Sequence, residues 1–165
     1  MAKTSHFALS AWGTRGSNLD GVLRLLLRFS EAVDNRRVDA IAALFTPDGL
    51  FQLGPQSVSG PPAVAEFYRE RLRDPARRTR HLWSNVMLSS ERGRSARFGA
   101  VLTNYVFEPS VSTTEVQMRV GDVSGVCRRD ARGDWLFVEH RYERTYALRL
   151  PLVDAPPPPT GETRS

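Results

Sequence analysis

The sequence predicts an α+β fold, in which three N-terminal helices pack on a strongly bent antiparallel sheet to form a cone-shaped α+β barrel. Apolar residues recur at helical spacing up to Asp74, and from Thr79 to Leu148 the chain reads as strands separated by short loops. Its 165 residues, 41% of them hydrophobic, suffice for one folded domain. Helices followed by a long antiparallel sheet are typical of α+β proteins, and a bent sheet closed by helices can enclose an apolar cavity.

Three helices are expected, over residues 18–35, 38–45 and 61–73. Ser17 can cap the first helix, whose apolar residues recur every three or four positions. The sequence Pro47-Asp48-Gly49 is a turn signal that ends the second helix. Pro61 and Pro62 open the third, because a proline is tolerated in a first turn, where its missing N–H would be unpaired anyway.

Strands are expected over residues 50–53 and 57–60, as a hairpin, and then over residues 79–90, 95–107, 115–129 and 135–148. The last four are joined by short loops, so they should pair as an antiparallel meander. Residues 1–17 are expected to be a flexible leader and residues 18–150 the folded domain. Residues 151–165 are expected to be a disordered tail, because they include four consecutive prolines from Pro156.

Side-chain alternation predicts which face of each strand is internal. In the strands at 95–107, 115–129 and 135–148 the even-numbered residues are the more apolar and should face inward, which leaves Cys127 outside. On each of these inward faces one polar residue does not belong in a plain core: Asn104, Asp122 and His140. Because burial of an unpartnered polar or ionisable group costs several kcal/mol, such residues are normally paired or functional. In the strand at 79–90 both faces mix polar and apolar residues, so alternation alone does not predict which face is internal.

The positive charge does not by itself predict a nucleic-acid partner. Lys+Arg 23 against Asp+Glu 18 gives a net charge of +5, but Lys3 is the only lysine and arginines are spread through every segment. The densest arginine cluster is interleaved with acidic residues rather than with stacking aromatic residues, which indicates a solvated helix face. That cluster consists of Arg69, Arg71, Arg73, Arg77, Arg78 and Arg80.

Other classes of protein are disfavoured by what the sequence lacks. Cys127 is the only cysteine, which excludes an intramolecular disulfide and a thiolate metal cage and favours a cytoplasmic location. No stretch approaches the roughly 18 consecutive apolar residues that cross a bilayer. There is no HExxH motif, glycine-rich phosphate loop or nucleophile elbow, so neither a metal nor a cofactor is expected.

An ordered set of motifs resembles the SnoaL-like family of the nuclear-transport-factor-2-like superfamily, from about Leu19 to Tyr146. The motifs are Phe29–Arg37 continuing into Asp39–Gly49, Val58-Ser59-Gly60, Arg80–Val86, and Arg128–Asp130 leading to Gly133–Phe137. The resemblance implies a cone-shaped and often dimeric domain used by small cofactor-independent enzymes. These include scytalone dehydratase, a hexachlorocyclohexane dehydrochlorinase, ketosteroid isomerase and polyketide cyclases.

The resemblance also implies a catalytic pair, with His81 as the base and Asp34 as the carboxylate that holds it. This places Trp83 and Asn85 on the cavity side of their strand. Independently, Asp34 lies in the last turn of a helix, where the helix dipole disfavours a negative charge and a histidine partner would relieve it.

Further cavity residues are expected from the remaining polar and aromatic positions. Asn85 or Asn104 could hydrogen-bond a substrate carbonyl or hydroxyl, and Asp122 or His140 could supply a second proton-transfer group. Aromatic walls would exclude water and select substrate shape, and the candidates are Phe51, Phe67, Trp83, Phe98 and Tyr142.

The expected function is therefore proton abstraction beside an electron-withdrawing group of a small, apolar, cyclic metabolite, followed by elimination, isomerisation or cyclisation. Natural-product biosynthesis and aromatic or xenobiotic metabolism are the settings that this chemistry suggests. The chain is expected to be a homodimer, with Tyr105 a candidate for the dimer surface. The alternative is a non-catalytic protein of the same fold, either a ligand carrier or a partner subunit of an oxygenase, because fold alone does not confer activity.

Overall fold

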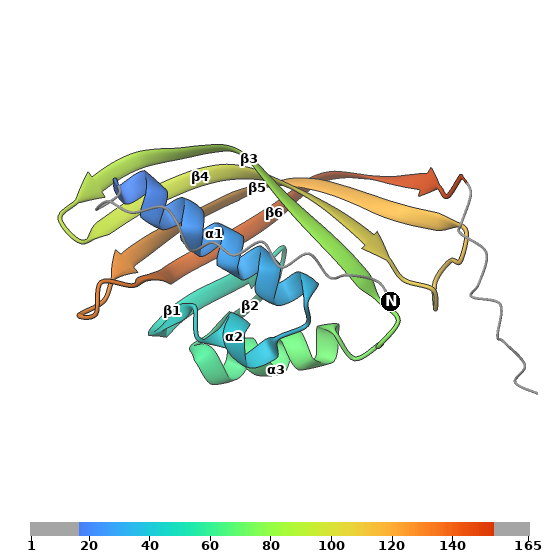
Figure 1. The fold of residues 1–165 in the computed structure, drawn as a ribbon, viewed down its shortest axis with the longest axis horizontal. Coiled ribbons are helices and arrows are strands. Elements are labelled where there is room, and N and C mark those ends of the chain that lie inside the picture. Colours follow the sequence, from blue (N-terminus) through green and yellow to red (C-terminus); the bar gives the residue numbers. More distant parts are fainter. Residues whose placement is uncertain (1–16, 154–165) are drawn as a thin grey trace, which may run out of the picture.

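The computed structural model describes residues 17–153, so most of the predicted leader and most of the predicted tail lie outside the described residues. Helices and a six-stranded sheet make up the fold (Figure 1). The helices are α1 (Asn18–Asp34), α2 (Val38–Ala42) and α3 (Pro61–Arg71). The strands are β1 (Phe45–Leu53), β2 (Gln56–Ser59), β3 (Arg78–Arg92), β4 (Ser95–Phe107), β5 (Glu115–Arg129) and β6 (Trp135–Pro151).

Helix α1 begins and ends where its sequence predicts. Ser17 and Asp20 form a capping box, in which each side chain accepts a hydrogen bond from the backbone N–H of the other. At the other end Arg36 adopts a positive φ of 62°, which turns the chain out of the helix. The Arg36 guanidinium then donates hydrogen bonds to the carbonyl oxygens of Leu72 and Arg77. The C-terminus of α1 is thereby tied to the segment between α3 and β3.

The sheet is open and mixed, whereas the prediction was a cone-shaped barrel with an entirely antiparallel sheet. Its strand order is β2-β1-β6-β5-β4-β3, so β2 and β3 are edges. The meander from β3 to β6 is antiparallel, as predicted. However, β1 pairs in parallel with β6, because the chain crosses to β3 at the far edge and then returns strand by strand to β1.

Strand β1 is also longer than its sequence predicts. It begins at Phe45, which was expected to be helical, and runs through Pro47-Asp48-Gly49, which was expected to be a turn. Its pairing with β6 shifts between Phe45 and Leu50, so these three residues form an irregularity within the strand.

The inner face of the sheet, which faces the helices, is the opposite of the predicted face in β5. Val123, Gly125 and Cys127 are buried, whereas Asp122 is exposed. A glycine on the inner face of β5 explains why the prediction was wrong. A Cβ at Gly125 would lie only 2.7 Å from the Phe98 ring, so this inward position must lack a side chain and contributes nothing to an apolar count.

Bulges change the inward parity in two other strands. In β6 the partner of Val126 is Glu139 but the partner of Cys127 is Phe137, so one residue is inserted between them. Both Phe137, predicted to be outside, and His140, predicted to be inside, are therefore buried. In β3 the register shifts beyond Ser84, and Asn85 has a φ of 51° and is exposed.

The core lies between α1, α3 and the inner face of the sheet. An aromatic cluster fills it, and its members are Phe29, Phe45, Phe51, Tyr68 and Phe137. No helix in the described residues is long and apolar enough to cross a membrane.

Candidate active site

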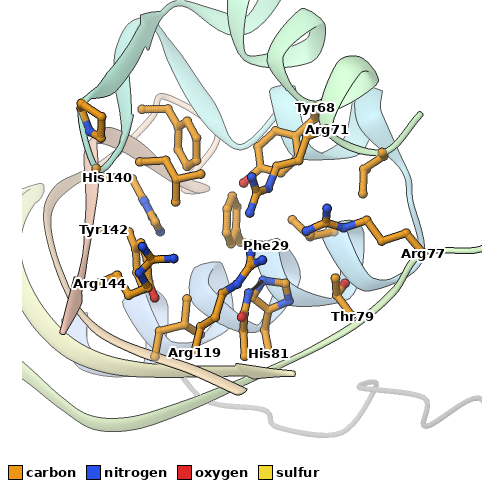
Figure 2. Close-up of a pocket in the computed structure, with 18 residues that line it drawn as sticks. Phe29, Tyr68, Arg71, Arg77, Thr79, His81, Arg119, His140, Tyr142 and Arg144 are labelled. Atoms are coloured by element: carbon orange, nitrogen blue, oxygen red, sulfur yellow. Dashed lines mark hydrogen bonds between the residues drawn. The ribbon is translucent and has the colours of Figure 1, made fainter. Parts of the chain in front are cut away.

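A cavity of about 280 Å³ opens between the C-terminal half of α1, α3 and the inner face of the sheet. Its 18 lining residues come from segments far apart in the sequence (Figure 2). Apolar residues such as Phe29, Val33, Phe51 and Leu102 form part of the lining, and polar residues form the rest. The site is therefore a partly apolar chamber with a small set of convergent polar groups, which is the usual make-up of a small-molecule site.

Asp34 and His81 are in direct contact at the wall of this cavity. Nδ1 of His81 lies 2.6 Å from Oδ1 of Asp34, and the His81 backbone N–H donates to Oδ2 at 3.0 Å. Asp34 is the last residue of α1, and His81 lies in β3, which packs beside that helix. The side chains of His81 and Asp34 are 8% and 13% exposed, so the pair is largely shielded from water.

Thr79, which no motif singled out, completes the surroundings of the carboxylate. Its hydroxyl donates a hydrogen bond of 2.7 Å to Oδ1 of Asp34. Burial alone would raise the pKa of Asp34, but the His81 ring and the Thr79 hydroxyl together lower it below its ordinary value. Asp34 is thus a fixed anion, and Nδ1 of His81 must carry the proton that it donates to this anion.

In the neutral form of the His81 ring, the other nitrogen, Nε2, carries the lone pair. Nε2 lies 3.2 Å from the amide nitrogen of Asn104, which faces it from the paired strand β4. With Nδ1 protonated, Nε2 accepts from that amide, and Oδ1 of Asn104 is left buried without a hydrogen-bond partner in the described chain. His81 and Asn104 both line the cavity, so the acceptor nitrogen lies where a ligand could reach it.

His140 forms the opposite part of the cavity wall. Its ring is only 1% exposed and is tilted against Phe29, with ring centroids 4.8 Å apart. Neither ring nitrogen has a hydrogen-bond partner among residues 17–153. Burial lowers the pKa of His140 to about 4, so the ring is neutral at physiological pH and can still exchange a hydrogen bond with a ligand.

The remaining predicted site residues divide into two groups. Phe51 and Tyr142 line the cavity with Asn104 and His140, whereas Phe67 and Phe98 pack in or against the core without lining it. Asn85 and Asp122 are exposed and do not line the cavity, contrary to expectation.

Trp83 supports the site instead of lining it. Its indole N–H lies 3.1 Å from the carbonyl oxygen of Leu26 and 2.5 Å from the hydroxyl of Ser30, both in α1. These contacts hold β3 against α1 two residues from His81, and so help to set the distance between His81 and Asp34.

Four arginines also line the cavity and were not anticipated as site residues: Arg71, Arg77, Arg119 and Arg144. The sequence places Arg71 and Arg77 in a cluster that was interpreted as a solvated helix face, but Arg77 is buried and Arg71 is half-buried. Arg119 faces the same side of β5 as Gly121 and Gly125. These glycines were therefore the one feature of the sequence that could have indicated that Arg119 faces inward. The described residues contain no group of three or more His, Cys, Asp and Glu side chains placed to hold a metal ion.

Comparison with known proteins agrees with this architecture. A family model described as a SnoaL-like domain matches residues 17–141. No curated protein sequence matches the chain.

Several solved structures share the fold. One from Novosphingobium aromaticivorans, named provisionally as a scytalone dehydratase, has a TM-score of 0.72 and 18% identity over 90% of this chain and 95% of that one. A type 2 hexachlorocyclohexane dehydrochlorinase has a TM-score of 0.70 and 17% identity over 85% and 94%. ActVI-ORFA from Streptomyces coelicolor has a TM-score of 0.68 and 19% identity over 78% and 98%.

Proposed function

The chain belongs to the SnoaL-like domain family, and from that premise we propose that it is an acid/base enzyme acting on a small cyclic substrate through an Asp34–His81 dyad. The observation that carries the proposal is the 2.6 Å contact between Nδ1 of His81 and Oδ1 of Asp34 at the wall of the cavity. The proposed reaction class, lyase, isomerase or cyclase, also accords with the names of structures that share the fold.

The proposed first step is transfer of a proton from a substrate carbon to Nε2 of His81, after the substrate has displaced the Asn104 amide N–H that donates to Nε2 in the unliganded protein. The carbon is adjacent to a carbonyl, so the electron pair of the broken C–H bond moves into an enolate. The imidazolium that forms lies against the Asp34 anion, which stabilises its charge and keeps the ring oriented. A positioned base of this kind typically contributes about 10²- to 10⁴-fold to the rate.

In the second step the imidazolium returns the proton. Delivery to a hydroxyl on the neighbouring carbon releases water and leaves a carbon–carbon double bond. Delivery to a different carbon gives an isomer, and attack of the enolate carbon on a second carbonyl, which then receives the proton, closes a ring. Each route balances in atoms and charge with no external oxidant or reductant.

Polar atoms without partners in the described chain would bind the substrate oxygens. Among them, Oδ1 of Asn104 would accept from a substrate hydroxyl, and the ring nitrogens of His140 and the hydroxyl of Tyr142 would bind substrate oxygens. Burial raises the pKa of Tyr142, although nearby arginines oppose this shift, so its hydroxyl stays protonated and can donate to a developing enolate. Phe29, Phe51 and Leu102 would contact the ring body of the substrate.

The experiment that tests this function is carbon-acid exchange in deuterium oxide. Bicyclic ketones such as 2-tetralone, small enough for the cavity, would be incubated with the protein and followed by mass spectrometry. Catalysed deuterium incorporation that is lost in His81→Gln is the expected result. Exchange that is unchanged in His81→Gln, or absent with the intact protein across a panel of cyclic ketones, would contradict the proposal.

We also propose that two copies of the chain associate through the outer face of the sheet. Cross-strand pairing places six large apolar residues on adjoining rows of this face, and we refer to them as the outer patch: Leu82, Tyr105, Met118, Val120, Tyr146 and Leu148. Leu82, Tyr146 and Leu148 are exposed, at 52%, 52% and 48%. Exposed apolar surface of this kind commonly marks a protein contact, and the self-association expected from the family resemblance would cover it.

A further inference from the structure

The charge of the cavity lining is strongly one-sided. Four of the 18 lining residues are arginines, and none is Asp or Glu. One carboxylate outside the lining, that of Glu108, forms an ion pair of 3.1 Å with Arg77. The Asp34 anion is engaged by His81 and Thr79. The charges of Arg71, Arg119 and Arg144 are therefore not balanced by any carboxylate paired with them in residues 17–153.

The three guanidinium groups are directed into the cavity from different elements. Arg71 is at the end of α3, Arg119 is in β5 and Arg144 is in β6, and Figure 2 shows their side chains converging on the space in front of His81. Gln117 orients Arg119, since its Oε1 accepts hydrogen bonds from Nε, at 2.8 Å, and from Nη2. The guanidinium groups of Arg71 and Arg144 form no hydrogen bond or ion pair with another described residue, so their N–H donors are available.

Electrostatics make this arrangement costly when the cavity is empty. Burial lowers the pKa of both Arg71 and Arg119, repulsion from neighbouring arginines lowers it further, and attraction to Glu108 opposes this shift without reversing it. An arginine nevertheless remains protonated in a protein. Like charges held together in a half-enclosed site raise the free energy of the unliganded protein, and an anion with several oxygens would relieve that repulsion while satisfying the free N–H donors.

We propose that the ligand of this cavity is a cyclic molecule bearing an oxyanion, a carboxylate or a phosphate ester, and that Arg71, Arg119 and Arg144 bind that oxyanion. The ring body would lie against Phe29 and Phe51, which places it within reach of His81. This inference deepens the proposed function by naming the substrate class, and its catalytic meaning rests on that function, whereas the anion binding itself does not.

Binding measured by isothermal titration calorimetry tests the proposal with three probes of similar shape: 2-naphthoate, 2-naphthyl phosphate and the neutral 2-naphthamide. At least one anion should bind about 10-fold or more tightly than the amide, as expected for charge-assisted hydrogen bonds. Arg119→Met and Arg144→Met should each weaken anion binding by about 10-fold and leave amide binding nearly unchanged. Arg144 is exposed at the cavity mouth, so its substitution should not disturb folding.

The matched control is Arg80→Met, which removes the same charge from an exposed position of β3 outside the cavity lining. It should leave anion affinity within about twofold of the unmodified protein, because a distant surface charge is screened by salt. Equal binding of anions and amide, an Arg80→Met effect as large as that of Arg144→Met, or no binding of any probe at millimolar concentration would each overturn the proposal.

His81→Gln separates this inference from the proposed function. The variant should retain the preference for the anionic probes, because His81 is not among the groups assigned to the oxyanion. An unmodified protein that prefers the anionic probes but catalyses no deuterium exchange would refute the proposed function and support the oxyanion site. Catalysed exchange by the unmodified protein without any preference for the anionic probes would refute the oxyanion site and support the proposed function.

Discussion

Asp34 accepts hydrogen bonds from both the backbone N–H and the ring of His81, so one carboxylate fixes the position of the strand as well as the imidazole. Thr79 binds the same carboxylate from two residues earlier in β3. Because Asp34 ends α1, the geometry of the pair depends on how α1 and β3 dock. The contacts of Trp83 with α1 maintain that docking.

Asp34→Asn should lower the rate of deuterium exchange by about 10²- to 10⁴-fold, similar to the loss in His81→Gln. An asparagine can donate its amide N–H to Nδ1, which would move the ring proton to Nε2 and remove the lone pair that accepts the substrate proton. Exchange kinetics measured at fixed pH provide the test. A rate within about threefold of the unmodified protein would exclude Asp34 from the mechanism.

Thr79→Val serves as the matched variant, because it keeps the carboxylate and removes a single hydrogen bond to it. We expect a loss of about 10-fold or less, because a single hydrogen bond typically contributes about 0.5–1.5 kcal/mol net. A loss as large as that of Asp34→Asn would mean that positioning of the carboxylate, rather than its charge, dominates.

Protonation of His140 should make the protein less stable as the pH falls from about 6.5 to 4. The pKa of this histidine is about 4 in the folded protein and about 6.5 in the unfolded chain, so the unfolded state binds the proton first. The stabilisation is fully present above pH 6.5. Its loss amounts to about 3 kcal/mol, from 1.36 kcal/mol for each unit of pKa difference.

Chemical denaturation at a series of pH values, on the unmodified protein and on His140→Phe, measures this contribution. Phe can pack among the same aromatic rings and does not titrate. The fall in stability between pH 6.5 and 4 should be about 3 kcal/mol smaller in the variant. The folding stability that Asp34 contributes does not interfere. Because the pKa of Asp34 is lowered in the folded protein, that stability is lost as the pH falls below about 3.8. Identical pH dependence in the two proteins would contradict the assignment.

Gly125→Ala should destabilise the protein by about 1–3 kcal/mol, since it forces extra volume into a packed interior. Its Cβ would lie 2.1 Å from the backbone oxygen of Glu139 and 2.7 Å from the Phe98 ring, and backbone cannot yield as a flexible side chain can. Gly99→Ala in the neighbouring strand is the control, because a Cβ there meets no atom within 4 Å. Thermal unfolding of both variants tests this, and equal melting temperatures would contradict it.

The glycines of β5 limited how much of the site could be predicted from the sequence. The pair Asp34 and His81 was predictable because each lies in a local motif. The inward face of β5 was not, since its inner positions are occupied by Gly121 and Gly125 while apolar residues such as Met118 and Val120 face outward. Counting apolar residues therefore selected the wrong face and placed Asp122 inside.

The arginines of the cavity were missed for two other reasons. Arg144 has the even-numbered parity predicted to face inward, as His140 and Tyr142 do, but no motif distinguished it from the other arginines spread through the chain. Arg71 and Arg119 lie 48 positions apart in the chain (119 − 71) and meet at the cavity only through the tertiary fold.

Disrupting the outer patch should convert a dimer to a monomer. Leu82→Glu combined with Tyr146→Glu places four like charges across a two-fold contact made by that patch, and their repulsion in a desolvated interface opposes association. Sedimentation velocity at micromolar concentrations should show a dimer for the unmodified protein and a monomer for the double variant. Leu27→Glu is the control, because Leu27 is similarly exposed at 49% but lies on α1, away from the outer face of the sheet, and it should leave the dimer intact. An unmodified protein that sediments as a monomer would refute self-association through this face.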